Sequence, residues 1–331
     1  MIAALQAALA ARAALLAGHT AGRTTAFRLF NGFSEGCPEL AADLYADTLL
    51  LHNYADPPES AGSLLADAQQ FYRAQLPFLR AIVIKTRHSP DPAARRGQVA
   101  FGGDPARKVR EAGVWYALDL LLNRDASFYP DTRGLRAWAR ENLAEKTVLN
   151  TFAYTGSLGV AALAGGAQRV VQLDRSRDFL HIARQSCALN GFSPRRVRFL
   201  AADFFRETAR LRRAGQTFDC VFLDPPFFAA RARGSVDAQT QFDRLINKAR
   251  PLVADGGWLA AVNNALFFSG ADYLALLDRL CADGYLSLEQ IIPVPPDCVG
   301  YPATARAEPL VRPAPFNHPT KIVVLRMRRK D

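Results

Sequence analysis

The chain has 331 residues, 50% hydrophobic and 22% charged, a composition that is ordinary for globular proteins and argues against extensive disorder. Its 41 lysines and arginines outnumber its 31 acidic residues, an excess that suits a polyanionic partner but also occurs on ordinary solvated surfaces. The five cysteines are scattered and form no CxxC pair, which argues against a disulfide framework or a zinc site and favours reduced thiols in the cytoplasm.

The alanine-rich start of the chain resembles a secretion signal only superficially. Residues 1–18 lack a basic segment and carry Arg12 inside the apolar run, so we expect an amphipathic helix, and we assign residues 1–24 to it. Elsewhere no stretch approaches the roughly 20 apolar residues of a membrane span, and we expect no membrane association.

Residues 25–112 have a turn-rich, strand-like pattern that predicts a small α+β domain. We expect a turn region at 28–40, apolar strands at 48–54 and 80–87, and a helix between them at 64–79. Residues 89–103 contain two prolines, two adjacent arginines and three glycines, and predict an exposed loop before the next domain.

Residues 113–331 alternate apolar strands with segments of helical length. This rhythm predicts an α/β, Rossmann-like domain whose buried, largely parallel sheet is covered by helices on both faces. Ligands of such sheets bind where the strands end, so the residues after each strand are candidates for the site. The expected strands are seven: 147–152, 169–173, 197–201, 218–223, 258–262, 286–294 and 321–327.

The ends of the first three strands carry residues suited to a nucleoside. Gly156 and Gly159 lead into an apolar helix, where they serve a close ligand approach or a plain packing turn; the pattern is neither GxGxxG nor a phosphate-binding Walker motif. Asp174 is placed to accept hydrogen bonds from ribose hydroxyls, or to cap the next helix. Asp203 and Phe204 offer a carboxylate for an exocyclic amine and an aromatic ring for an adenine face.

The fourth strand ends in Asp224, Pro225, Pro226 and Phe227, the most specific pattern in the chain. Two prolines remove backbone donors and stiffen the loop, which leaves acceptors that suit the amino edge of a planar base. Phe227 is placed to stack on that base. The alternative is a proline-rich turn with a core phenylalanine.

Together these motifs resemble the class I S-adenosylmethionine-dependent RNA methyltransferases. They are "NTFAYTGSLG" from Asn150, Asp174, Asp203-Phe204 and "DPPF" from Asp224. Within that class the chain is similar to bacterial large-subunit ribosomal RNA methyltransferases, which include cytosine-C5 and guanine enzymes, from about Arg28 to the C-terminus. "FRLFNGFSEGCPEL" resembles the start of that family's middle α+β domain, and "NRDASFYPDTR" resembles the segment that leads into its cofactor site.

The resemblance implies a seven-stranded class I methyltransferase domain over residues 113–331, preceded by a substrate- or RNA-recognition domain over 25–112. It implies S-adenosylmethionine as the cofactor, ribosomal RNA as the partner and no metal. Thr132 stands where the family usually has glutamine. The implied catalytic residues are Asp224, Pro225, Pro226, Phe227 and Asn263. The implied cofactor-binding residues are Phe128, Asp131, Arg133, Asn150, Phe152, Tyr154, Thr155, Gly156, Asp174, Arg175, Asp203, Phe204 and Asp224.

Two departures from the family pattern bear on the substrate. Only about 25 residues precede the α+β domain, so we expect no N-terminal PUA domain and RNA contacts from other surfaces. Cytosine-C5 transfer needs a thiolate, usually in a "Cys-Ser" strand end after the fifth strand, where this chain has Asn263 and Asn264. This strand end resembles that of the guanine methyltransferases and favours a nitrogen acceptor, although asparagines also cap helices.

RNA binding would draw on basic clusters along the chain. The loop with Arg231 and Arg233 is the best candidate because it follows the "DPPF" turn; the others are Arg95-Arg96, Arg107-Lys108-Arg110 and the tail from Arg326 to Lys330, more readily read as a solvated end. Three alternatives stay open: a cytosine-C5 enzyme, a methyltransferase acting on a small molecule or protein, and a non-catalytic RNA-binding assembly factor.

Overall fold

The computed structural model describes residues 1–226 and 237–328, with the backbone alone described for 237–241. The chain forms two compact units, one of Met1–Asp131 with Pro295–Pro309 and the other of Thr132–Val294 with Leu310–Asp331. The first unit therefore takes in the segments expected as residues 1–24 and 25–112 and continues to Asp131.

The first unit is built on a five-stranded sheet of order β1-β2-β3-β4-β5, in which only β3 and β4 pair in parallel. A parallel pair needs a crossover connection, which α4 (Gly62–Gln75) supplies. Alternate residues of the strands pack with α4 and α1 (Ile2–Ala11) into one apolar core. The strands are β1 (Ala26–Asn31), β2 (Leu40–Tyr45), β3 (Thr48–Asn53), β4 (Ala81–Thr86) and β5 (Gln98–Gly102).

Two expectations for this unit are wrong. Residues 28–40 hold the end of β1, the short α3 (Gly32–Glu35) and the start of β2 rather than a turn region alone. The loop expected at 89–103 contains α5 (Pro92–Arg96), capped by Asp91, and the edge strand β5. β5 is exposed along almost its whole length, so it carries no apolar alternation. The remaining elements are α2 (Ala13–Thr20), η1 (Pro58–Ala61), β6 (Lys108–Glu111), β7 (Val114–Ala117), η2 (Pro130–Thr132) and α12 (Pro296–Val299).

The expected N-terminal helix is two helices, α1 and α2, which meet at Arg12. In the described part of the chain no single helix is long and apolar enough to cross a membrane, and only α1 and α2 taken together, with a 64° bend, reach that length and hydropathy. Arg12 is fully buried and pairs with Glu35 through two hydrogen bonds of 2.9 and 3.0 Å.

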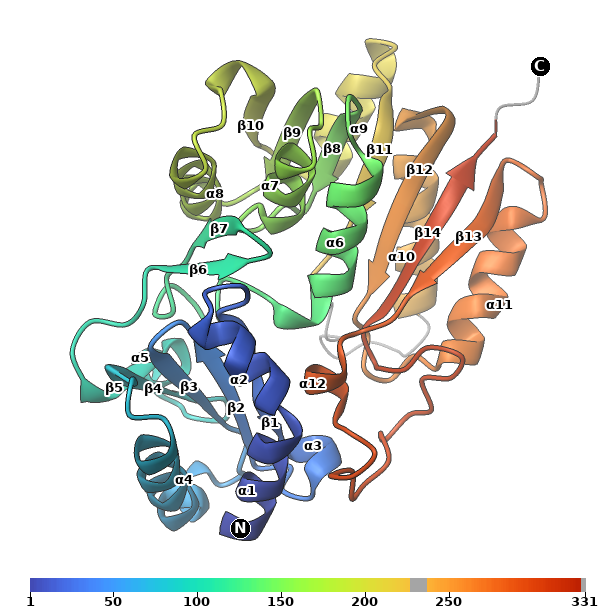
Figure 1. Cartoon of the computed structure of the whole chain (residues 1–331). Helices are drawn as coiled ribbons and strands as arrows, with labels where there is room; N and C mark the ends of the chain where they lie inside the picture. Colours follow the sequence, from blue (N-terminus) through green and yellow to red (C-terminus); the bar gives the residue numbers. More distant parts are fainter. Residues whose placement is uncertain (227–236, 329–331) are drawn as a thin grey trace. The chain divides into compact units, whose positions relative to one another are not determined.

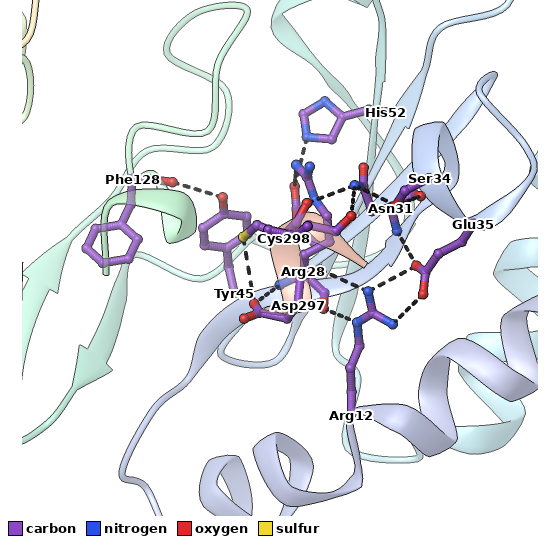
Figure 2. Close-up of polar contacts among 12 residues, drawn as sticks. Arg12, Arg28, Asn31, Ser34, Glu35, Tyr45, His52, Phe128, Asp297 and Cys298 are labelled. Carbon is purple, nitrogen blue, oxygen red and sulfur yellow. Dashed lines mark hydrogen bonds and ion pairs between the residues drawn. The ribbon is translucent and has the colours of Figure 1, made fainter. Parts of the chain in front are cut away.

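This ion pair belongs to a buried polar network that holds residues 295–309 in the first unit (Figure 2). Arg12 donates to the carbonyl of Asp297 at 2.9 Å, and the Asp297 carboxylate accepts from the amide of Arg28 at 3.0 Å. Arg28 also binds the Asp43 carboxylate through two bonds. Burial alone would raise the pKa of Asp43, but Arg28 and the hydrogen bond from His52 outweigh it and hold that pKa well below its usual range.

The second unit contains a seven-stranded sheet of order β10-β9-β8-β11-β12-β14-β13, in which only β14 runs antiparallel to its neighbours. The helices α6 (Arg133–Asn142), α7 (Ser157–Ala164) and α8 (Arg177–Leu189) cover one face (Figure 1). The other face packs on α9 (Phe204–Arg213), α10 (Asp237–Ala249) and α11 (Gly270–Cys281). The predicted fold class, a seven-stranded α/β domain preceded by a small α+β domain, is confirmed.

The strands lie where the sequence predicts them, within a few residues. They are β8 (Thr147–Thr151), β9 (Arg169–Asp174), β10 (Val197–Ala201), β11 (Phe218–Leu223), β12 (Val253–Asn263), β13 (Leu286–Ile292) and β14 (Lys321–Met327). β12 begins earlier than expected: Val253 already pairs with Phe218 of β11, and the register then shifts before Trp258 pairs with Cys220. Short 3-10 turns, η3 (Pro194–Arg196) and η4 (Arg250–Leu252), precede β10 and β12.

Candidate functional site

The chain order of the sheet reverses at β8, which has β9 on one side and β11 on the other. Ligands of open α/β sheets bind at such a switch point, outside the carboxyl ends of the strands. The registers bring these ends level, because Thr151 pairs with both Leu173 and Leu223, and Ala201 pairs with Asp174. The predicted residues after β8, β9, β10 and β11 therefore gather along one edge of the second unit's sheet.

The loop between β8 and α7 has a constrained backbone. Phe152 and Tyr154 both adopt positive φ values, 52° and 50°, and Gly156 follows at 80°. Two non-glycine residues in this left-handed region cost of the order of 1–3 kcal/mol each and mark functional segments. A Cβ on Gly156 would lie 2.6 Å from the Cβ of Ala183, so only glycine fits the turn that opens α7.

Asp174 supports this loop from the end of β9. Its Oδ2 accepts from the amide of Tyr154 and its Oδ1 from the amide of Ser176, both at 2.8 Å. Ser176, not Asp174, caps α8, since its hydroxyl accepts from the amide of Phe179. The structure therefore joins the first two strand-end motifs of the sequence through one half-buried carboxylate.

Asn150 and Gln172 form a buried amide pair beneath the same loop. Asn150 Nδ2 donates to Gln172 Oε1 at 2.8 Å, and Gln172 Nε2 donates to the carbonyl of Gly156 at 3.0 Å. Asn150 Oδ1 is buried and accepts no hydrogen bond. A buried acceptor without a hydrogen bond lowers the stability of the fold, and a donor group on a bound ligand would supply the missing bond. Gln172 was not among the residues expected from the sequence, because it lies within an apolar strand.

The residues after β10 divide between surface and core. Asp203 is exposed and caps α9 by accepting from the amide of Arg206 at 3.2 Å. Phe204 is 3% exposed and stacks on Phe152, with 4.7 Å between ring centroids. Phe152 is the more exposed ring of this pair. Contact of Phe204 with an adenine face therefore stays a prediction. Arg175, beside Asp174, is exposed.

The "DPPF" turn is described as far as Pro226. Asp224 is half-buried directly after β11, Pro225 is buried and Pro226 is exposed. Phe227, Arg231 and Arg233 lie outside the described residues. On the neighbouring strand Asn263 is 4% exposed, and its Oδ1 accepts from the amide of Ala265 at 3.1 Å.

Neither Asn263, the last residue of β12, nor Asn264 caps the following helix, since Ser269 caps α11. Lys321 lies opposite Asn263 in the antiparallel register of β12 and β14 and is 1% exposed. Its ammonium group donates to the carbonyls of Ala265 and Pro319, at 3.1 and 2.5 Å. Burial lowers the pKa of Lys321 to about 8. Lys321 was not among the site residues expected from the sequence, although a lysine at the start of an apolar strand is a usable signal.

The segment "NRDASFYPDTR" spans the division between the units. In the first unit Phe128 is 1% exposed, its carbonyl accepts from the Tyr45 hydroxyl at 2.9 Å, and its ring lies 4.9 Å from that of Tyr116. Asp131 is half-buried in η2. In the second unit Arg133 is the first residue of α6.

Thr155 is buried, 4% exposed, in the loop before α7. None of the five cysteines, all within the described residues, follows a strand of the seven-stranded sheet. In the second unit burial raises the pKa of Cys187 to about 12, that of Cys220 well above its usual value, and that of Cys281. Each is therefore poorly suited to supply a thiolate near neutral pH. Across residues 1–226 and 237–328 no group of three or more His, Cys, Asp or Glu side chains could hold a metal ion.

Several basic candidates for RNA contact already have partners. Arg95 donates to the carbonyls of Ser89 and Pro90, and Arg107 lies 3.5 Å from Asp119. Arg326 pairs with Glu289 at 2.7 Å.

Known proteins with similar sequences identify the family to which this chain belongs. Residues 27–297 match the sequence profile of a family described as S-adenosylmethionine-dependent methyltransferases. Ribosomal RNA large subunit methyltransferase I of Aeromonas hydrophila is 32% identical over 265 residues, which cover 79% of this chain. The enzyme of the same name from Vibrio cholerae is 31% identical over 269 residues. The chain spans 66% of the length of each of these relatives.

Solved structures show the same fold. A crystal structure of a methyltransferase complexed with SAH superposes with a TM-score of 0.84 at 20% identity, covering 98% of this chain and 80% of that one. An S-adenosylmethionine-dependent methyltransferase structure from Streptococcus mutans superposes with a TM-score of 0.82 at 19% identity, with the same coverage. The chain belongs to the family of S-adenosylmethionine-dependent methyltransferases and is distantly related to large-subunit ribosomal RNA methyltransferase I.

Proposed function

We propose that this methyltransferase modifies a base of large-subunit ribosomal RNA, with a guanine nitrogen as the acceptor, and that it does so in the cytoplasm. The RNA substrate is supported by the names of its relatives and by the formal charge of +10. The nitrogen acceptor rests on one observation: asparagine, not cysteine, ends β12, beside the strand that Asp224 follows.

The strand-end residues fit the cofactor. S-adenosylmethionine carries an ammonium group, ribose hydroxyls and an adenine amine, all hydrogen-bond donors. The edge of the sheet offers acceptors for such groups: the unpartnered Asn150 Oδ1 and the carboxylates of Asp174 and Asp203. We assign the cofactor to these residues and to the loop of Phe152, Tyr154, Thr155 and Gly156, with Arg175, Phe204, Arg133 and Asp224 as further contacts. For Phe128 and Asp131, a part in cofactor binding stays a prediction from the family resemblance.

A nitrogen acceptor removes the need for a nucleophile from the enzyme. When bound, S-adenosylmethionine would supply a methyl group on a positively charged sulfur. The nitrogen lone pair would form a bond to the methyl carbon as the carbon–sulfur bond breaks, with neutral S-adenosylhomocysteine as the leaving group and no covalent enzyme intermediate. The chain's own residues then have to align the base, exclude water and handle the proton.

Asp224 and Asn263 are placed for that work. Asp224 follows Leu223, which pairs with Ala261, and Asn263 is two residues beyond Ala261 on the adjacent strand. The carboxylate of Asp224 orients an exocyclic amine by accepting its hydrogen bond, and receives the proton if that amine is the acceptor. Pro225 and Pro226 stiffen the turn that presents it. Asp224, Pro225, Pro226 and Asn263 would line the base site. Phe227 joins them as a prediction from its place in the sequence.

The first unit is the proposed substrate-recognition domain. A base can enter a site at the sheet edge only when it is unpaired or flipped, at a cost of a few kcal/mol, so contacts with the RNA backbone must compensate. The basic residues of the first unit and the loop after the "DPPF" turn are the proposed sources of those contacts.

The test is methyl transfer from radiolabelled S-adenosylmethionine to unmodified ribosomal RNA, with wild type, Asp224→Asn and the control Asp178→Asn, an exposed carboxylate on α8. We expect Asp224→Asn to lower turnover about 100-fold or more, because general acid–base groups contribute about 10²–10⁴-fold, and to weaken cofactor binding far less than that. The control should keep wild-type turnover. Undiminished turnover would remove Asp224 from the site, and transfer to protein alone would contradict RNA as the acceptor.

A further inference from the structure

A turn at the carboxyl edge of the second unit's sheet exposes two large apolar side chains. β12 ends at Asn263, and beyond it Leu266 is 54% and Phe267 76% exposed. The amide of Phe268 donates to the carbonyl of Ala265 at 3.3 Å, which closes a β-turn with Leu266 and Phe267 at its central positions. Single exposed hydrophobic residues are common on protein surfaces, so their exposure alone assigns no role.

This turn is braced on both sides. Before it, Ala265 is held twice, through its amide by Asn263 Oδ1 at 3.1 Å and through its carbonyl by the buried ammonium of Lys321 at 3.1 Å. After it, Phe268 is 7% exposed, with its ring 6.1 Å from that of Tyr273. The backbone that carries Phe267 is therefore fixed at the point where the side chain meets solvent, which lowers the entropy lost when a ligand binds.

The position of the turn connects it with the proposed acceptor site. Parallel strands end at one edge, and β12 neighbours β11, so Phe267 follows the edge at which Asp224 and Asn263 lie. Among the described residues of this turn, Leu266 and Phe267 are the exposed apolar side chains, since Phe268 packs in the core. A stable protein partner covers roughly 800 Å² on each side, whereas a nucleobase needs a single ring.

Resting on the proposed function, we infer that Phe267 is a nucleobase-binding residue whose ring stacks on an unpaired base of the RNA beside the base that is methylated. Aromatic stacking is how proteins hold splayed-out bases of single-stranded RNA. Lys321 is a positioning residue in this arrangement, because it fixes the carbonyl of Ala265 and with it the turn.

The experiment compares RNA methylation kinetics of wild type, Phe267→Ala and Phe267→Trp at saturating cofactor. We expect Phe267→Ala to raise KM for ribosomal RNA about 5- to 100-fold with little change in kcat, and Phe267→Trp to keep KM near that of wild type. Cofactor affinity should stay unchanged in both. The matched control is Tyr285→Ala, since Tyr285 is 36% exposed and precedes β13, at the opposite edge of the same sheet.

Base stacking on the residue introduced in Phe267→Trp should also quench its fluorescence when RNA binds. An inactive wild type would refute the proposed function, and this inference with it. Active wild type with an unchanged KM in Phe267→Ala would refute the inference alone. A rise of KM seen only with assembled ribosomal particles, and not with free RNA, would also refute it, because it would identify a contact with protein. An equal rise of KM in Phe267→Ala and Phe267→Trp would refute it as well.

Discussion

Replacing Glu35 by glutamine tests how the first unit holds its buried charges. The Glu35 carboxylate accepts from both terminal nitrogens of Arg12, from the amide of Asn31 at 2.7 Å and from the hydroxyl of Thr304. The side chains of Arg12 and Glu35 are 0% and 1% exposed. Glutamine has nearly the same shape but removes the negative charge and turns one acceptor into a donor.

The structure sets the magnitude of the loss. Breaking a buried ion pair by removing one partner costs about 3–5 kcal/mol, because the other charge stays buried without compensation. We therefore expect Glu35→Gln to lower the free energy of unfolding of the first unit by about that amount. The double variant Arg12→Met/Glu35→Gln should lose less than the sum of the two single variants, because it leaves no uncompensated charge.

The assay is denaturant-induced unfolding followed by hydrogen exchange in peptides of residues 1–131, which reports the first unit separately. The control is Arg80→Met, which breaks the exposed pair of Arg80 and Asp47, 3.6 Å apart with side chains 82% and 39% exposed. Such pairs contribute about 0–1 kcal/mol. If Glu35→Gln costs no more than Arg80→Met, the network of Figure 2 does not hold the unit together as described.

Three further predictions concern the second unit. Asp174→Ala should weaken S-adenosylmethionine binding about 10- to 100-fold in calorimetry, because hydrogen bonds to charged groups contribute about 1.5–3 kcal/mol; Asp178→Ala should bind normally, and equal affinity of both would contradict the role of Asp174. Gly156→Ala should destabilise the unit more than Gly191→Ala, since both glycines have positive φ but only Gly156 has a neighbour, Ala183, in the way; equal losses in thermal unfolding would disprove the clash. Burial lowers the pKa of Lys321 in the folded protein to about 8, from its ordinary 10.5. Between these two pH values the unfolded chain binds more protons than the folded one, so the contribution of Lys321 to the free energy of unfolding rises with pH. Relative to Lys321→Met, wild type should gain stability from pH 7.5 to 10, and a constant difference in unfolding free energy would refute the shift.

The strands of the second unit could be predicted because each is a short apolar run that is buried on both faces. The order of those strands puts Asp174, Asp203 and Asp224 at one edge, so their gathering followed from the strand assignments alone. The edge strand β5 could not be predicted, because an exposed strand needs no apolar alternation and its pairing with β4 is the only signal.

Contacts between distant residues account for what the sequence analysis missed. Arg12 reads as a polar interruption of a helix, and nothing local indicates that it binds Asp297, 285 residues away. Lys321 faces Asn263 only because β14 runs antiparallel to β12. The positive φ values of Phe152 and Tyr154 could not be predicted from the sequence either, since both residue types ordinarily adopt negative φ.

The most direct test of the central claim is nucleoside mass spectrometry of unmodified ribosomal RNA after reaction with the enzyme and S-adenosylmethionine. We expect a methylguanosine, formed by wild type and absent with Asp224→Asn. A 5-methylcytidine would contradict this expectation, because that product requires a thiolate nucleophile and asparagine, not cysteine, ends β12.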